Sequence, residues 1–126
     1  MAQPGQVCWV DLDATDAGAA KDFYGKLFGW TAHDEPANGG IFTRLRHAGH
    51  DLGSLFQLQP KHMEFGAYSH WTPYVQVDGL DETVRQAQAL GGRVIVAPFR
   101  VDGVARIALI LDAVGAQVGL WEPIPA

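Results

Sequence analysis

Near the start of the chain, apolar and polar residues alternate. One side of this segment carries Cys8, Val10, Leu12 and Ala14, and the other side carries Trp9, Asp11, Asp13 and Thr15. A period of two is typical of a strand with one buried face. Apolar residues then recur at helical spacing, at Ala20, Phe23, Tyr24, Leu27 and Phe28. We expect a helix here that is capped by Asp16 and ends at Gly29. An Asp22–Lys26 ion pair is expected on its solvent-exposed side.

Three short strands are predicted next, at residues 30–34, 40–46 and 51–58, with turn-forming residues between them. A long loop covers residues 59–69. A further strand follows, and a second helix begins at Asp78 or Gly79, ends at Gly91 and has one apolar side made of Leu80, Val84, Ala87 and Leu90. Strands at residues 93–97, 104–111 and 117–121 complete the chain.

The order β-α-β-β-β therefore occurs twice, and Leu12 and Gly29 of the first half correspond to Val75 and Gly92 of the second. One helix can cover only one face of a four-stranded sheet. The sequence thus predicts an α+β fold in which two tandem βαβββ modules form a curled eight-stranded sheet with helices outside and a central cleft. The length of 126 residues fits one domain. Its expected parts are module one at about 7–58, the loop at 59–69 and module two at about 70–122.

Composition narrows the range of partners. Nine basic residues stand against 14 acidic ones, the net charge is −5, and no run of Lys or Arg occurs. Nucleic acid and membranes are therefore not expected as partners. A single cysteine, Cys8, excludes an intrachain disulfide, and the first residues lack the charge and apolar run of a signal peptide. We expect a cytoplasmic protein.

Three segments together resemble a known family. WVDLDATDAGAAKDFYGKLFGW, VDGLDETVRQAQALGGRV and LDAVGAQVGLWEP are similar to the vicinal oxygen chelate superfamily, the group of glyoxalase I, bleomycin-resistance proteins and extradiol dioxygenases. Within it, the chain most resembles the actinobacterial glyoxalase-like antigens and "hydroxylases". The resemblance covers nearly the whole chain. It implies the two-module fold, and it implies enzymes that hold a divalent metal with four side chains, one from each of four strands.

The expected metal-ligand positions carry the wrong residues for that chemistry. The resemblance places three of the ligands at Trp9, Thr72 and Gly119, and the fourth within residues 53–57, where no Glu, Asp or His occurs. Zn²⁺, Ni²⁺, Mn²⁺ and Fe²⁺ require imidazole or carboxylate donors, which Trp, Thr and Gly do not supply. We expect no metal cofactor, unless this assignment of positions is wrong.

The strand alternation predicts which side chains face the cleft. Seven of these form the candidate ligand site: Trp9, Asp11, Thr72, Tyr74, Gln76, Gly119 and Trp121. The three aromatic rings would form its walls, and Gly119 would leave room for a ligand. The alternative is that the rings simply fill the space that a metal would occupy.

Two further groups could carry chemistry. Asp11 beside tryptophan rings is a candidate acid or base, although pairing with Arg44 or Arg106, or hydration at the rim, is the favoured interpretation. Asp13 is expected at the rim. His47 and His50, with His70, are a second-choice metal set, but the first two fall in a hairpin turn that favours solvent exposure.

Three functions remain open. The favoured one is a metal-free protein that binds a small apolar or aromatic molecule. The second is a glyoxalase-like lyase or isomerase, or a dioxygenase, that uses a displaced metal or Asp11. The third is an interaction domain with a filled cleft. Met63, Phe65 and Tyr68 in the loop could form a lid or a dimer contact, and a homodimer is favoured over a monomer.

Overall fold

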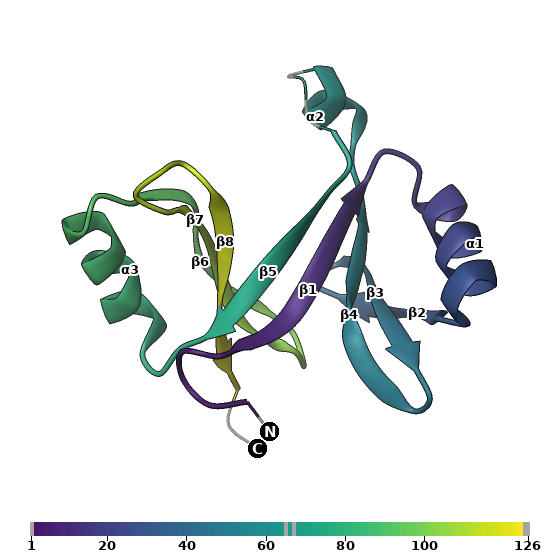
Figure 1. The fold of residues 1–126 in the computed structure, drawn as a ribbon, viewed down its shortest axis with the longest axis horizontal. Helices are drawn as coiled ribbons and strands as arrows, with labels where there is room; N and C mark the ends of the chain where they lie inside the picture. The colour runs from purple at the N-terminus through teal and green to yellow at the C-terminus, as the bar shows by residue number, and fades with distance from the viewer. Residues whose placement is uncertain (1, 65, 67, 125–126) are drawn as a thin grey trace. The chain divides into compact units, whose positions relative to one another are not determined.

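The computed structural model describes residues 2–124 except 65 and 67 (Figure 1). The chain divides into two compact units, one of residues 9–72 and the other of residues 1–8 together with 73–126. Each unit has its own hydrophobic core. The predicted α+β class and the twofold βαβββ order are both confirmed. In the described residues, no helix is long and apolar enough to cross a membrane.

The unit of residues 9–72 holds the first module. Its elements are β1 (Val7–Ala14), α1 (Ala17–Phe28), β2 (Thr31–Ala37), β3 (Gly40–His47) and β4 (His50–Gln57). The strand order is β2-β3-β4-β1, and β1 runs parallel to β4 while the other neighbours are antiparallel. Figure 1 shows α1 alongside these strands. The core between them contains Leu12, Ala14, Leu45 and Leu55.

Local sequence chemistry sets both ends of α1. The Asp16 carboxylate accepts a hydrogen bond from the backbone N–H of Ala19 at 3.0 Å, which satisfies one of the free donors of the first turn. Gly29 ends the helix in the left-handed conformation, with φ of 76°. The predicted Asp22–Lys26 pair forms at 3.0 Å. These predictions are confirmed.

The prediction of a buried apolar stripe on α1 is wrong for three of its five residues. Phe23, Leu27 and Phe28 are more than half exposed, and no residue of the helix is fully buried. Only Ala20 and Tyr24 of the predicted stripe pack on the core. The apolar stripe is therefore wider than the strip of helix that contacts the sheet.

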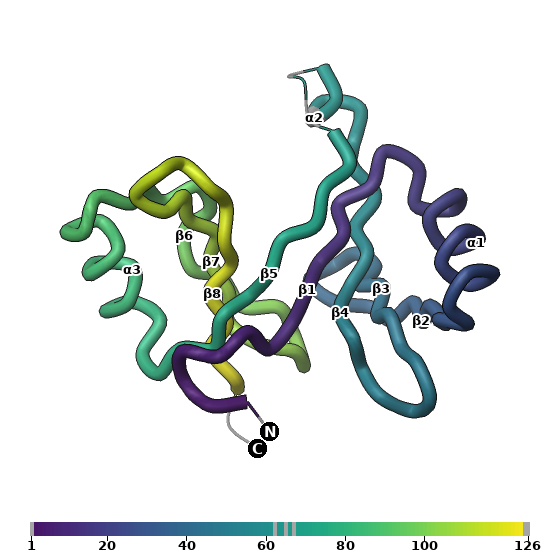
Figure 2. The backbone as a smooth tube through the Cα atoms, in the orientation of Figure 1, coloured from purple at the N-terminus to yellow at the C-terminus, as the bar shows by residue number. Residues whose placement is uncertain are grey.

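Two-residue turns connect β2 to β3 and β3 to β4, and the path of the chain from β3 to β4 can be followed in Figure 2. Asn38 and Gly39 both have positive φ, as do Ala48 and Gly49. Such turns match the right-handed twist of the paired strands. The tight Asn38-Gly39 turn lets β2 continue to Ala37, through residues that we predicted to be part of the turn. A short helix, α2 (Pro60–Glu64), also lies within the predicted loop. Phe65 lies outside the described residues.

The second unit repeats the same plan. It contains most of β5 (His70–Gln76), then α3 (Leu80–Ala89), β6 (Arg93–Val101), β7 (Ala105–Leu111) and β8 (Gln117–Pro123). The strand order is β5-β8-β7-β6, with β5 parallel to β8. Helix α3 packs on the core through Leu80, Val84 and Ala87 as predicted. Leu90 is 79% exposed because the helix has already ended there, so its predicted burial is wrong.

Helix α3 receives its N-terminal cap from another strand. Gly79 precedes the helix and provides no side-chain cap. Instead, the Glu122 carboxylate on β8 accepts a hydrogen bond from the Leu80 N–H at 2.7 Å and also contacts Arg106 at 3.2 Å. An acidic group at this end also interacts favourably with the helix dipole.

Candidate functional site

The parallel strand pairs identify the fourth position at which the superfamily would hold a metal. In the first unit Asp11 pairs with Ser54, and in the second unit Tyr74 pairs with Gly119. Because the first strands of the two modules correspond, Ser54 takes the place in its unit that Gly119 takes in the other. By this correspondence, the four positions that the resemblance implies fall at Trp9, Ser54 and Thr72 in the unit of residues 9–72 and at Gly119 in the other unit.

These four residues do not fit a divalent metal. They offer one indole, two hydroxyls and a glycine, whereas the metals of such enzymes are held by imidazole or carboxylate. The Ser54 hydroxyl is also engaged already, since it donates to Asp11 at 2.6 Å and accepts from the Trp9 indole N–H at 2.9 Å. Among the described residues, no group of three His, Cys, Asp or Glu side chains could hold a metal ion.

Trp9 is fixed in position by two different contacts. Its indole nitrogen donates to Ser54. The guanidinium of Arg44 lies over its ring, with the central carbon 5.8 Å from the ring centroid, and the same group lies 5.4 Å from the Phe42 ring. A cation over an aromatic face is stabilising at this separation. Trp9 is thus a buried ring whose orientation is set by its neighbours.

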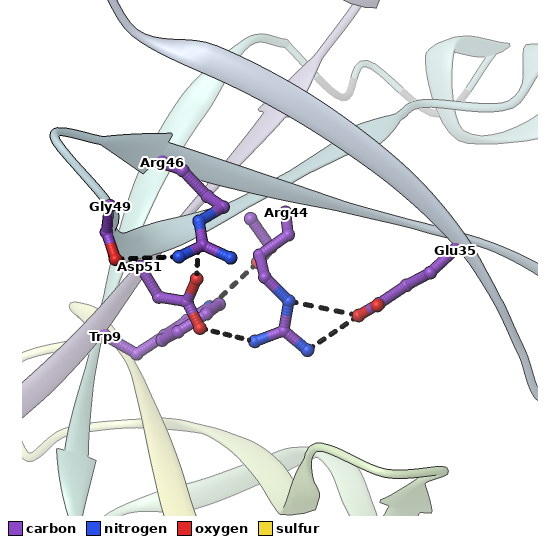
Figure 3. Close-up of polar contacts among 7 residues, drawn as sticks. Trp9, Glu35, Arg44, Arg46, Gly49 and Asp51 are labelled. Carbon is purple, nitrogen blue, oxygen red and sulfur yellow. Dashed lines mark hydrogen bonds and ion pairs between the residues drawn. The ribbon is translucent and has the colours of Figure 1, made fainter.

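Arg44 is in turn held by two carboxylates, as Figure 3 shows. It contacts Glu35 at 2.6 Å and Asp51 at 2.8 Å. Burial acts to lower the pKa of Arg44, but the bonds and charges of the two carboxylates outweigh it and raise that pKa. Arg46 also contacts Asp51, at 3.3 Å. Since Arg44 is neutralised in this way, its expected pairing with Asp11 is wrong.

Asp11 lies instead beside a second carboxylate. Asp11 and Asp13 are both half-buried on one face of β1, and Asp11 accepts a hydrogen bond from the Ser54 hydroxyl at 2.6 Å. The pKa of Asp11 is raised to about 8, chiefly by burial; the neighbouring Asp13 carboxylate contributes to this rise, while the hydrogen bond from the Ser54 hydroxyl opposes it. The expected alternative partner, Arg106, contacts Asp81 and Glu122 in the other unit, so that expectation is also wrong.

Asp13 also contacts His70. Its Nε2 atom lies 3.3 Å from the Asp13 carboxylate, and its Nδ1 atom lies 2.7 Å from the backbone oxygen of Tyr68. Because a carbonyl oxygen only accepts, Nδ1 carries a proton. The Asp13 side chain is half-buried, with 18% of its surface exposed.

The aromatic residues of the second unit pack on each other. Tyr74 is buried, and its ring meets that of Trp121 edge-on with centroids 6.0 Å apart. A Cβ atom on Gly119 would overlap the Tyr74 ring. The room that we expected beside Gly119 is therefore filled by Tyr74. Thr72 is buried in the first unit, and the backbone of Gln76 in the second unit pairs with Gly5 and Gln6.

Sequence reasoning missed one residue and one connection. Ser54 lies within residues 53–57, where the sequence shows no Glu, Asp or His and so gave no sign of a site residue. His70 was expected only in a second-choice metal set, and no sequence signal linked it to Asp13. His47 and His50 face each other across their turn and are exposed, as predicted.

Comparison with solved structures shows which proteins share this fold. The fold matches methylmalonyl-CoA epimerase from Mycobacterium tuberculosis, with a TM-score of 0.68 at 20% identity over 99% of this chain and 93% of that one. It also matches the hypothetical protein BH1468 from Bacillus halodurans, with a TM-score of 0.71 at 14% identity over 98% of each chain. At these identities the likeness concerns the fold, which is that of the vicinal oxygen chelate superfamily.

The family follows from the sequence comparison. A family model described as "Glyoxalase-like domain" matches residues 9–119, and the chain belongs to this family. "Putative glyoxylase CFP32" of Mycobacterium bovis is 36% identical over 90% of this chain and 44% of its own length. "Anthracycline biosynthesis protein DnrV" of Streptomyces peucetius is 33% identical over 94% of this chain and 47% of its own length. The chain thus spans less than half the length of these relatives.

Proposed function

We propose that this glyoxalase-like protein binds a small aromatic molecule without the divalent metal of its superfamily. The observation that carries the proposal is the environment of Trp9, where an aromatic ring held by Ser54 and Arg44 occupies a metal-ligand position. Tyr74 and Trp121 form a second aromatic pair in the other unit. Rigid rings bind flat apolar molecules at a small cost in conformational entropy.

The names of relatives agree with this ligand class. Two of the similar proteins are named for anthracycline biosynthesis. Such a protein could sequester the compound and so provide resistance to it, or it could assist the metabolism of the compound. We also propose a homodimer in the cytoplasm. The single Cys8 forms no disulfide within the chain, which is the usual state in a reducing compartment.

Tryptophan fluorescence tests the proposal. We expect neutral naphthoquinone and anthraquinone probes to quench the emission of the full chain and to raise its melting temperature, because they would stack near Trp9 or Trp121. Binding should be the same in protein treated with EDTA and in protein supplied with Zn²⁺, Ni²⁺ or Mn²⁺. Elemental analysis of the purified protein should show no stoichiometric metal.

Two matched variants test whether the probes bind near Trp9. Trp9→Phe should weaken probe binding about tenfold or more, because it removes the indole that Ser54 and Arg44 hold. Trp71→Phe is the control, since Trp71 belongs to a different cluster with Tyr24 and Trp30. Equal loss of binding in both variants, or no quenching by any probe, would contradict the proposal.

A further inference from the structure

One side of α1 is apolar and exposed. Phe23 and Leu27 are 58% and 56% exposed, and neither packs on the core of its unit. Together with Ala19, Asp22 and Lys26 they line one open hollow on the surface. These five residues recur at the spacing of a single helix stripe, and we call them the α1 face. Large apolar side chains that lie next to each other on a surface indicate a place where another molecule binds.

The α1 face carries one charge of each sign. Asp22 and Lys26 form an ion pair at 3.0 Å, and their side chains are 64% and 79% exposed. Such an exposed pair adds little to the stability of the chain itself. The chain as a whole has a net charge of −5, so the α1 face is a neutral surface on an acidic protein. A strongly basic or strongly acidic partner meets no excess of opposite charge there, whereas a second neutral face can pair with both charges.

The arrangement of the α1 face makes it complementary to a second copy of itself. Asp22 and Lys26 are four residues apart, as are Phe23 and Leu27, which corresponds to about 6 Å along the helix. The midpoints of the two pairs differ by one residue, or about 1.5 Å, so one twofold axis can serve both pairs. When two such faces meet antiparallel, Asp22 of each copy lies beside Lys26 of the other, and Phe23 lies beside Leu27. A twofold contact requires this kind of self-complementary surface.

We propose that the α1 face is the surface through which two copies of this chain associate. The inference rests on the homodimer proposed above, and it adds the interface and its symmetry. The apolar side chains of each copy fill the hollow of the other, and the two ion pairs combine into a ring of four alternating charges. A partner of different sequence would not require Asp22 and Lys26 to complement each other.

The size of the α1 face sets the strength of this dimer. A stable interface buries about 800 Å² on each partner. Helix α1 has 12 residues and is therefore about 18 Å long, and only one of its sides takes part. We therefore expect a reversible dimer with a dissociation constant on the order of tens to hundreds of micromolar.

Reversal of the two charges tests the pairing. In Lys26→Asp the face has two negative charges, and in Asp22→Lys it has two positive ones. We expect each variant alone to associate about tenfold more weakly than wild type, because like charges meet across the axis. An equimolar mixture of the two variants should associate again, since each face then meets the opposite charge. Sedimentation equilibrium of the full chain, at concentrations up to about 1 mM, measures these constants.

The control for charge reversal is an ion pair on the other helix. Arg85 and Glu82 lie 2.6 Å apart on α3 and are as exposed as the pair on α1. Arg85→Asp changes the net charge of the chain by the same amount as Lys26→Asp, so it should leave the association constant near that of wild type.

A second pair of variants tests the apolar part of the α1 face. Leu27→Ser should weaken association about tenfold, because it removes a side chain that would be buried between the copies. Leu90→Ser is the matched control, since Leu90 is 79% exposed at the end of α3 and should not affect association. Melting temperatures close to that of wild type show that both variants are folded.

The outcomes separate the interface from the homodimer itself. A wild-type dimer that Lys26→Asp, Asp22→Lys and Leu27→Ser leave as strong as before would overturn the α1 interface but leave the proposed homodimer intact. Single variants that associate weakly, with a mixture that does not recover, would overturn the twofold pairing. A wild-type chain that sediments as a monomer at every concentration would overturn the interface and the homodimer together, and would assign the α1 face to a partner of different sequence.

Discussion

A Gly53→Ala protein is expected to lose about 3 kcal/mol or more of folding stability, which is a large part of the total for a domain of this size. Gly53 lies on β4 directly opposite Val10 of β1. A Cβ atom on Gly53 would overlap the carbonyl oxygen of Val10 and would come within 2.9 Å of its Cγ2 atom. Because the obstacle includes backbone, no change of rotamer can relieve it. The two parallel strands would have to separate.

Urea unfolding followed by circular dichroism measures this loss. Gly18→Ala is the matched control, because Gly18 lies in α1 and its nearest atom would be 3.5 Å from the new Cβ. Alanine in a helix should leave stability unchanged or raise it by up to about 1 kcal/mol. Since Ser54 follows Gly53, the carboxyl titration of Asp11 should also change if the Gly53→Ala protein folds. A Gly53→Ala protein as stable as wild type would show that β1 and β4 do not pair as described.

Those parts of the fold that depend on neighbours in the chain could be predicted from the sequence. The Asp16 cap, the Gly29 stop and the Asp22–Lys26 pair all involve residues within one or two helical turns. The alternation in β1 also assigned Leu12 to the core correctly. Such features follow from the backbone geometry of a helix or strand and need no knowledge of the tertiary structure.

The parts that the sequence could not show depend on distant contacts. Ser54 meets Asp11 only because β4 lies parallel to β1 in one particular register. His70 meets Asp13 across more than 50 intervening residues. Arg44 was an expected partner for Asp11, but Glu35 and Asp51 hold it. Charge and spacing alone could not decide between these carboxylates.

The exposed face of α1 illustrates the same limit. The stripe that contains Phe23 and Leu27 has the spacing of a buried face, yet these two side chains are 58% and 56% exposed. Periodicity shows which residues share a side of a helix, but it does not show how much of that side the sheet covers. Tyr24 and Trp30 stack with ring centroids 5.2 Å apart, so part of the aromatic surface packs on itself.

Replacing Asp11 by Asn is expected to stabilise the protein, and the gain should grow as the pH rises. The pKa of Asp11 is raised from 3.8 to about 8, so between these values the folded protein keeps a proton that the unfolded chain has lost. The folded state then binds more protons than the unfolded state, and stability falls by about 1.4 kcal/mol per pH unit in that window. Asparagine does not ionise and therefore removes this dependence. Its side-chain oxygen can still accept the hydrogen bond from Ser54.

Urea unfolding near pH 5 and near pH 8 tests the sign of this effect. The stability gained by Asp11→Asn over wild type should be greater near pH 8 than near pH 5 by a few kcal/mol, because about 1.4 kcal/mol per pH unit accumulates between the two values. Asp34→Asn is a control of opposite sign, because the hydrogen bond from Thr43 and the nearby Lys21 lower the pKa of Asp34. That carboxylate stabilises the folded state above its unfolded pKa, so its loss should destabilise the protein near pH 8. Wild-type stability that does not fall between the two pH values would mean that Asp11 is ionised in the folded protein, as a solvated carboxylate would be.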